Sequence, residues 1–367
     1  MQNKPMAALI PDTSVQSDSG YIGQLFTNHE TKPLVMLVIG YICVCFVGYG
    51  SVIGYVVYLC SPPAAVVPAV SLVAATVEAC IDYGFFYLIN HGVEEQLLQN
   101  VFDESRKFFS LPLEEKMKLG RKGDVGFAPI YAENLDSSTS SKGDLKETFH
   151  IGPLEGYESH IKNQWPSKEL LPSWRFIMEE YYQKVVSVGK RLTSLIAMAL
   201  NLEDDFFEKV GALDKPYAFL RLLHYPGLNP GEVGDSDEVI YGASAHSDYG
   251  MVTLLATDAV PGLQVCREKH KQPRIWEDVR HIKGAFIINL GDMMERWTNC
   301  LFRSTLHRVM PTGKERYSMA LFLDPNPDCI VECLKSCCSD SSPPRFPPIR
   351  SGDHLRERIN AAYSASS

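Results

Sequence analysis

Two pairs of polar residues with the same spacing constrain this chain more than any other feature. His246 and Asp248 form the first pair, and Arg316 and Ser318 form the second. On an extended strand residues i and i+2 point to the same face, so each pair can present both side chains to one site. We therefore expect extended chain at both places. His307 lies between the two pairs in the sequence and would reach them from another strand.

His246, Asp248 and His307 are side chains of the types that bind a transition metal. Two imidazoles and one carboxylate on one face of an octahedral ion leave three adjacent positions open, as in non-haem Fe(II) oxygenases. A guanidinium and a hydroxyl on one face suit a carboxylate held near such an ion. Each motif alone is weak, because a chain with ten histidines contains a chance His-x-Asp often enough. Their order and their surroundings carry the hypothesis.

Short apolar runs surround these residues and predict the fold. They are broken by Pro-Gly, Asn-Pro-Gly and Thr-Gly turns, and they read as β-strands of a sandwich. The runs are residues 217–226, 250–256, 284–292 and 303–309. The predicted fold class is α+β, mainly β, with a double-stranded β-helix (jelly-roll) core over residues 216–325 and flanking helices.

The spacing of apolar residues also predicts the flanking elements. Helical periodicity indicates helices over residues 69–83, 94–110 and 171–201 and a strand over 84–90. Residues 121–152 read as a loop-rich region with a polar stretch at 136–143.

The expected organisation follows the chain in four parts. These are an atypical N-terminal extension (1–67), an N-terminal region of helices and a strand (68–165), the jelly-roll domain (216–325), and a C-terminal tail that ends in a helix over 352–363 (326–367).

Charge and cysteine content limit the partners and the compartment. A net charge of −9 and a pI of about 5.6 argue against a nucleic-acid partner. Ten cysteines favour a reducing compartment. Cys329, Cys333, Cys337 and Cys338 invite a zinc interpretation, but they lack paired CxxC spacing, so a cysteine-rich strand and turn is the preferred interpretation.

With these motifs in view, the chain resembles the plant and fungal 2-oxoglutarate/Fe(II)-dependent dioxygenases, also called iron/ascorbate oxidoreductases. The resemblance covers about residues 68–363. The segments that carry it are Gly84–Val93, His246–Gly250, Pro261–Val265, Leu290–Asn299, Ser304–Val309 and Arg316–Ser318.

The resemblance implies a chemistry and a role for each motif. His246, Asp248 and His307 would bind Fe(II), while Arg316 and Ser318 would bind the distal carboxylate of 2-oxoglutarate. Tyr225 would hydrogen-bond the cosubstrate. The cosubstrates would be 2-oxoglutarate and O2, with ascorbate as reductant. Family members often carry Asn two residues before this tyrosine, whereas this chain has Leu223.

Three functions remain open from the sequence. The favoured one couples 2-oxoglutarate decarboxylation to hydroxylation or desaturation of a small metabolite. The alternatives are an ascorbate-driven oxidase of the same fold that does not use 2-oxoglutarate, and a non-catalytic small-molecule-binding relative. Arg316, Ser318 and Tyr225 together favour the first, and the complete triad argues against the last.

Four residues are candidates for contact with the substrate. Strand alternation puts Arg221 on one face with Tyr225, and Phe322 on one face with Ser318. An inward-facing arginine must either meet a structural carboxylate or await an anionic or phenolic substrate. Phe127 and Phe149 come from the loop region that covers the mouth of the site in relatives, although core packing is the commoner role of a phenylalanine.

Residues 34–60 do not fit the rest of the chain. The segment contains no charged residue and no proline, and it is long enough to cross a bilayer. Lys4 and Lys32 precede the segment and no Lys or Arg follows it before Arg106, so the positive-inside rule would place the catalytic region outside the cytosol.

We therefore expect the segment to be extraneous to the enzyme and to pack poorly against it. A membrane anchor and a buried core element are the alternatives. The enzyme is then expected to be a cytoplasmic monomer, with contact to a membrane only through residues 34–60 if they are native.

Overall fold

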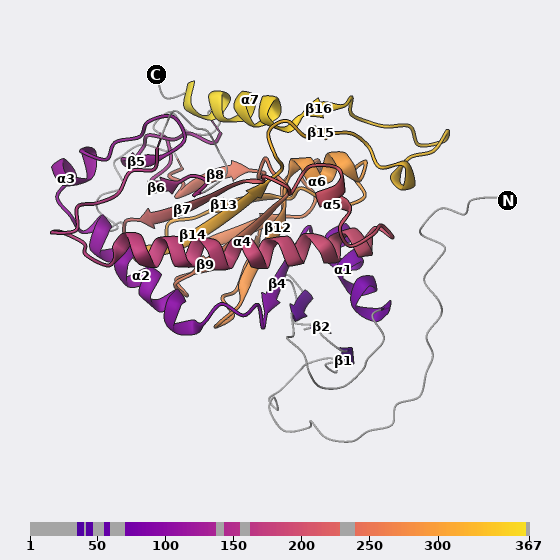
Figure 1. The fold of residues 1–367 in the computed structure, drawn as a ribbon, viewed down its shortest axis with the longest axis horizontal. Helices are drawn as coiled ribbons and strands as arrows, with labels where there is room; N and C mark the ends of the chain where they lie inside the picture. Colours follow the sequence, from indigo (N-terminus) through magenta and orange to yellow (C-terminus); the bar gives the residue numbers. More distant parts are fainter. Residues whose placement is uncertain are drawn as a thin grey trace. The chain divides into compact units, whose positions relative to one another are not determined.

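The computed structural model describes residues 70–136, 143–154, 162–227 and 239–364, together with the backbone of three short strands between residues 35 and 58. Two antiparallel sheets form the centre of the fold (Figure 1). The major sheet has the strand order β1-β2-β3-β4-β12-β9-β14-β7-β6-β5, and the minor sheet has the order β11-β10-β13-β8. The one parallel pairing in the described sheets joins β3 to β4. This arrangement is the predicted double-stranded β-helix.

The strands of the two sheets are short and come mostly from the C-terminal half. In the major sheet they are β1 (Val35–Ile39), β2 (Ile42–Phe46), β3 (Tyr55–Tyr58), β4 (Phe85–Ile89), β5 (Gly126–Ala128), β6 (Glu147–Ile151), β7 (Tyr217–Tyr225), β9 (Val252–Thr257), β12 (Phe286–Leu290) and β14 (Arg316–Asp324). In the minor sheet they are β8 (Ala243–His246), β10 (Leu263–Cys266), β11 (Glu277–Asp278) and β13 (Leu306–Val309). A small separate sheet pairs β15 (Ile330–Val331) with β16 (Ile349–Arg350).

Helices cover one face of the major sheet. The described helices are α1 (Val70–Asp82), α2 (Glu95–Phe109), α3 (Leu113–Met117), α4 (Trp174–Ala199), α5 (Phe206–Lys209), α6 (Asp292–Trp297) and α7 (Ser351–Ser364), with a 3₁₀ turn at Lys335–Cys337. In Figure 1, α4 crosses the face of the sheet beside α2. The predicted helices at 69–83, 94–110, 171–201 and 352–363 correspond to α1, α2, α4 and α7.

Helix α4 packs closely on the sheet because of its apolar periodicity. Its buried residues recur every three or four positions, from Trp174 through Met178 and Val185 to Leu192. Gly189 lies in this stripe at the point of closest approach. A Cβ there would come within 2.9 Å of Leu323, so glycine lets the helix rest on β14.

Strict alternation along β7 and β14 separates two cores. On β14, Tyr317, Met319, Leu321 and Leu323 face the helices. The intervening residues, among them Ala320 and Phe322, face the minor sheet, where a second apolar cluster lies between the sheets. The register pairs each residue of β14 with one of β7, so both strands change face together.

Residues 121–152 were expected to be a loop-rich region, but the structure shows two strands there. These strands, β5 and β6, extend the edge of the major sheet beside β7. Register explains the fate of the two phenylalanines in this region. Phe149 pairs with Leu222 and Phe127 pairs with Phe149, so both side chains point to the helix side. They are 0% and 1% exposed and pack near Phe108 and Trp174, which corrects their expected contact with the substrate.

The segment 34–60 contains the backbone of β1, β2 and β3, which continue the major sheet beyond β4. The side chains of this segment lie outside the described residues, so the expectation that it packs poorly is not tested. Among the helices of the described ranges, none is long and apolar enough to cross a membrane.

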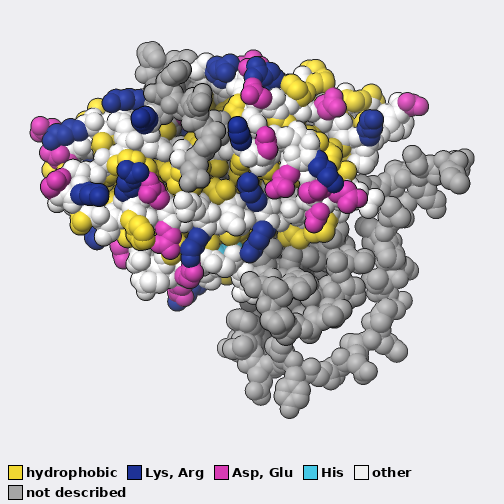
Figure 2. All heavy atoms as spheres, viewed as in Figure 1, with side chains coloured by type: hydrophobic (Ala, Val, Ile, Leu, Met, Phe, Trp, Pro, Cys, Tyr) yellow, Lys and Arg dark blue, Asp and Glu magenta, His cyan; other side chains and the backbone are white. Residues whose placement is uncertain are grey.

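Surface charge is mixed on the face that the helices cover. Figure 2 shows Lys and Arg side chains interspersed with Asp and Glu across this face. Such a surface is unlike the single-signed basic patch that binds nucleic acid.

Replacing Phe149 by Ala should destabilise the protein without touching the site between the sheets. We expect the free energy of unfolding to fall by about 3–5 kcal/mol, because a fully buried ring leaves a cavity. Urea unfolding measures this, and Phe176→Ala is the matched control because Phe176 is 70% exposed. A stable Phe149→Ala protein with impaired catalysis would contradict the correction.

Candidate metal centre

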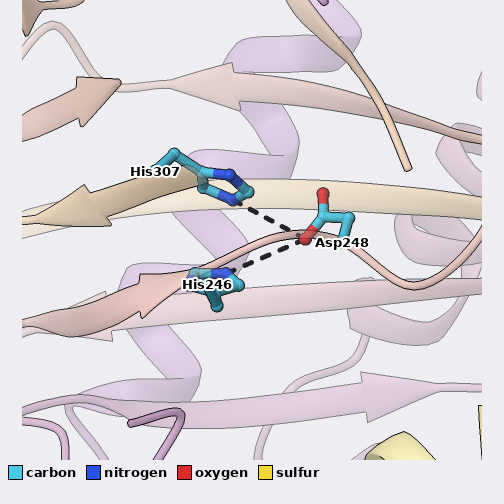
Figure 3. A group of neighbouring side chains, drawn as sticks. All are labelled: His246, Asp248 and His307. Carbon is cyan, nitrogen blue, oxygen red and sulfur yellow. Dashed lines mark ion pairs between the residues drawn. The ribbon is translucent and has the colours of Figure 1, made fainter. Parts of the chain in front are cut away.

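His246, Asp248 and His307 meet at one point between the sheets. Asp248 Oδ1 lies 3.8 Å from His246 Nε2 and 3.6 Å from His307 Nε2. Ligand atoms of all three residues lie within 4.8 Å of one another. Figure 3 shows both imidazoles directed at the Asp248 carboxylate. The two histidines are directly paired across β8 and β13, and Asp248 follows β8 by two residues.

Backbone carbonyls fix which imidazole nitrogen faces the site. His246 Nδ1 lies 2.7 Å from the Ser244 carbonyl, and His307 Nδ1 lies 3.1 Å from the Thr305 carbonyl. Each Nδ1–H can donate to its carbonyl, which leaves Nε2 as the free ligand atom. Burial, and then the neighbouring His307, lower the pKa of His246 to about 3. Its imidazole is therefore neutral, the form that binds a metal.

The Asp248 carboxylate is oriented in the same way. Its Oδ2 accepts hydrogen bonds from Thr253 Oγ1 at 2.5 Å and from Asn289 Nδ2 at 2.6 Å. Oδ1 is left for a metal. Burial alone would raise the pKa of Asp248, but the two imidazoles and these hydrogen bonds hold it below its usual value. The donor set therefore fits a divalent transition-metal ion, with two neutral nitrogens and one ionised oxygen.

Arg316, Ser318 and Tyr225 lie on the same inner face as the triad. All three line one cavity together with His246, Asp248 and His307. Arg316 donates to Ser318 Oγ at 3.2 Å and to the Val260 carbonyl at 3.3 Å, and its guanidinium lies 4.9 Å from the centre of the Tyr225 ring.

Arg316 is buried, with 3% of its surface exposed. Among the described residues no carboxylate forms an ion pair with it. A buried guanidinium without an anion is costly, so the site fits an anionic ligand.

Comparisons with known proteins agree with this geometry. The chain matches the family described as "non-haem dioxygenase in morphine synthesis N-terminal" over residues 67–168 and the "2OG-Fe(II) oxygenase superfamily" over residues 217–325. Kihadalactone A synthase LFS of Citrus sinensis is 42% identical over 293 residues, which cover 77% of this chain and 85% of that protein. The chain belongs to the 2-oxoglutarate/Fe(II)-dependent oxygenase family.

Two further relatives extend the match. The 2-oxoglutarate-Fe(II) type oxidoreductase hxnY of Emericella nidulans is 34% identical over 309 residues, covering 80% of this chain and 85% of that one. The crystal structure of a full-length Neurospora crassa protein in complex with alpha-KG superposes with a TM-score of 0.71 at 27% identity, over 79% of this chain and 90% of that chain. This protein is thus a 2-oxoglutarate/Fe(II)-dependent dioxygenase, an oxidoreductase that hydroxylates or desaturates its substrate.

A second cavity of the dioxygenase adjoins the metal centre. It shares Arg221, His246, Asp248 and Phe322 with the first. Phe322 stacks on Phe219 with 4.8 Å between ring centres, and the two rings form one wall. The expected inward faces of β7 and β14 are those observed. Leu223, where relatives often have Asn, is buried in the wall of the first cavity.

Arg221 lies in the cavity wall and also meets a carboxylate. Its Nη1 is 3.3 Å from Glu133 Oε1, and its guanidinium lies 5.3 Å from the centre of the Phe322 ring. Lys146 Nζ is 2.8 Å from the other Glu133 oxygen. Burial alone would raise the pKa of Glu133, but Arg221 and Lys146 hold it well below its usual value. Of the two roles considered for Arg221, the structure shows the pairing with a structural carboxylate, Glu133.

Sequence reasoning missed the buried partners that hold the centre. Asp144 accepts hydrogen bonds from the backbone N–H and the hydroxyl of Ser244, at 2.9 and 2.6 Å, and pairs with Lys146 at 2.5 Å. These contacts fix the strand that carries His246. Asn289 could have been recognised from the sequence, because it is a polar residue inside an apolar run. Asp144 lies one hundred residues before Ser244 and gave none.

The C-terminal cysteines form no metal site in the described part of the chain. Cys329, Cys333, Cys337 and Cys338 are free, and the triad is the one described group whose ligand atoms converge. The preferred interpretation, a cysteine-rich strand and turn, matches β15 and the 3₁₀ turn that follows it.

Replacing Asp248 by Ala should abolish iron binding and turnover, because the centre loses its only anionic ligand. Elemental analysis of protein purified with Fe(II) measures the bound iron. The exposed Asp340 provides the control, since it lines neither cavity beside the centre and Asp340→Ala should retain full iron. Wild-type iron content in the Asp248→Ala protein would contradict the assignment.

Replacing Arg221 by Met should destabilise the protein by about 1–3 kcal/mol, because Glu133 loses one of two buried cationic partners. Thermal and urea unfolding measure the loss. The double variant with Glu133→Gln should lose less than the sum of the two single variants. Unchanged stability in Arg221→Met would show that the pair is not structural.

Proposed function

We propose that His246, Asp248 and His307 hold Fe(II) in this dioxygenase, that Arg316 and Ser318 bind the distal carboxylate of 2-oxoglutarate, and that Tyr225 hydrogen-bonds this cosubstrate. The buried guanidinium of Arg316, on the same face as the triad, is the observation that carries this proposal. A bidentate guanidinium would fix the cosubstrate at one distance from the metal. Ascorbate is proposed as the reductant that keeps the iron in its Fe(II) state.

The bound iron and 2-oxoglutarate would use O2 to hydroxylate or desaturate a carbon of the substrate, releasing succinate and CO2. The residues around the centre have distinct tasks. Thr253 and Asn289 orient Asp248 through its outer oxygen. The apolar wall of Leu223, Ala320 and Phe322 excludes water from the space beside the metal. No general acid or base is needed from the protein for this chemistry.

The substrate is proposed to be a small organic molecule in the second cavity. The stacked Phe219 and Phe322 rings offer a flat apolar surface beside His246 and Asp248. Leu355 of α7 lines the same cavity, so the C-terminal helix contributes to its enclosure.

The protein is proposed to act in a reducing compartment such as the cytosol, because the described cysteines are free. A monomer is proposed, since one chain supplies a metal triad and a cosubstrate site without needing a residue of a second copy.

Succinate formation tests the cosubstrate assignment. Purified protein with Fe(II), ascorbate and 2-oxoglutarate should release succinate, and Arg316→Leu should weaken 2-oxoglutarate binding by about 2–5 kcal/mol, because the carboxylate loses its charged partner. Arg316→Lys should recover part of the affinity, since it restores the charge without the planar fork. Calorimetric titration measures the affinities.

The iron content separates this effect from damage to the metal centre. It should stay at the wild-type level in both Arg316 variants. Absence of succinate from the wild-type protein would favour the ascorbate-driven oxidase or the non-catalytic alternative.

A further inference from the structure

Asp324 is a buried carboxyl in the wall of the second cavity, and the chemistry above gives it no task. It is the last residue of β14 and shares its inward face with Arg316, Ser318 and Phe322. Only 3% of its surface is exposed. It lines the same cavity as His246 and Asp248, so a ligand beside the metal would come close to it.

Every other carboxylate of this cavity has a partner. Asp124 lies 3.1 Å from the Tyr217 hydroxyl and 3.5 Å from Arg121. Glu133 pairs with Lys146 and Arg221. Asp248 accepts from Thr253 and Asn289.

Asp324 differs from these acids. Within the described ranges of the chain, no side chain or backbone group hydrogen-bonds its carboxyl or forms an ion pair with it. A buried polar group that the protein itself does not satisfy is costly and indicates a ligand.

The backbone is shaped to admit this carboxyl. Gly250, two residues after Asp248, lies directly against it, and a Cβ at Gly250 would overlap Asp324 Oδ1 at 1.4 Å. A structural carboxyl in such a position would accept a hydrogen bond from the nearby chain, which is not the case here. Burial, and then the charge of Asp248, raise the pKa of Asp324 above its usual value.

The charges around the cavity also limit what can bind. The cations Arg121, Lys146 and Arg221 already lie against carboxylates of the chain. A second anionic ligand would therefore find no uncommitted cation among these three. The adjacent stacked pair of Phe219 and Phe322 suits an apolar, planar body.

We propose that Asp324 is a specificity-determining residue that accepts a hydrogen bond from an O–H or N–H group of the substrate. The substrate is accordingly an uncharged molecule with an apolar body and a donor group, not a carboxylic acid. This inference rests on the proposed function, since it takes the second cavity as the substrate site.

Isosteric fragment pairs test the proposal, because their members differ in one donor. The probes are phenol against fluorobenzene, indole against benzofuran, and benzoate as the acid. Their binding to protein loaded with Zn(II) and 2-oxoglutarate is measured by ligand-observed NMR at millimolar concentration. The wild type should prefer phenol and indole over their partners by at least about fivefold, a typical effect of one hydrogen bond. Benzoate should bind more weakly than phenol.

Two substitutions locate the effect at Asp324. Asp324→Leu should abolish the preference, whereas Asp324→Asn, which keeps an acceptor oxygen, should retain part of it. The exposed control Asp340→Asn should behave as the wild type. Removal of a buried carboxyl without a partner should also raise the melting temperature of Asp324→Leu above that of the wild type. A structural role predicts a lower melting temperature and an unchanged preference.

The outcomes separate this inference from the cosubstrate assignment. Equal binding within both pairs, a preference that survives in Asp324→Leu, tightest binding of benzoate, or no binding of any probe to the wild type would each overturn the proposal. Succinate release is recorded on the same wild-type preparation with Fe(II). Absence of succinate would refute the proposed function. The preference for probes with a donor group needs no turnover, so the NMR experiment would still measure it.

Discussion

The alternation of side chains along β7 and β14 is the constraint on which the rest of this dioxygenase depends. The register between the two strands holds over nine residue pairs, so each position has a fixed face. One face supplies the apolar core beneath α4, and the other supplies the wall beside the metal centre. A slip of one residue would exchange the two faces and move Arg316 and Ser318 into the helix-side core. The packing on the helix side, with Gly189 against Leu323, therefore fixes the strand register on which the site depends, although it does not contact the site.

A buried network of charges holds the strand that carries His246. Asp144 bonds Ser244, whose carbonyl faces His246 Nδ1, and Lys146 joins Asp144 to Glu133. Burial alone would lower the pKa of Lys146, but the two carboxylates raise it, so the ammonium stays charged. Such a network is costly to bury and offers little net stability. Its value lies in position, because it orients a metal ligand through contacts that an apolar core could not make.

Local patterns in the sequence predicted the parts of the structure that local patterns control. The i, i+2 spacing of Arg316 and Ser318 works as expected because both residues lie on β14, where strand geometry repeats every two residues. Asp248 lies two residues beyond the end of β8, and it still meets His246 and His307 at one point. The helices followed from apolar periodicity. The orientation of Phe149 could not be predicted, since it depends on the pairing of β6 with β7, and a strand of this length fits either register. Asp324 reads in the sequence as an ordinary acid at the end of a strand, and its lack of a partner appears only in three dimensions.

The two ends of β14 present opposite chemistry to ligands on one face. Arg316 stands at one end and Asp324 at the other, separated by roughly 26 Å of extended chain at about 3.3 Å per residue. His246 and Asp248 line the cavities at both ends. Arg316 would attract an anionic cosubstrate to its end of the strand, whereas the other end carries the Asp324 carboxyl in one cavity with Asp248. The two ends of β14 therefore offer different groups to a ligand on the inner face, a guanidinium and a hydroxyl at one end and a carboxyl at the other.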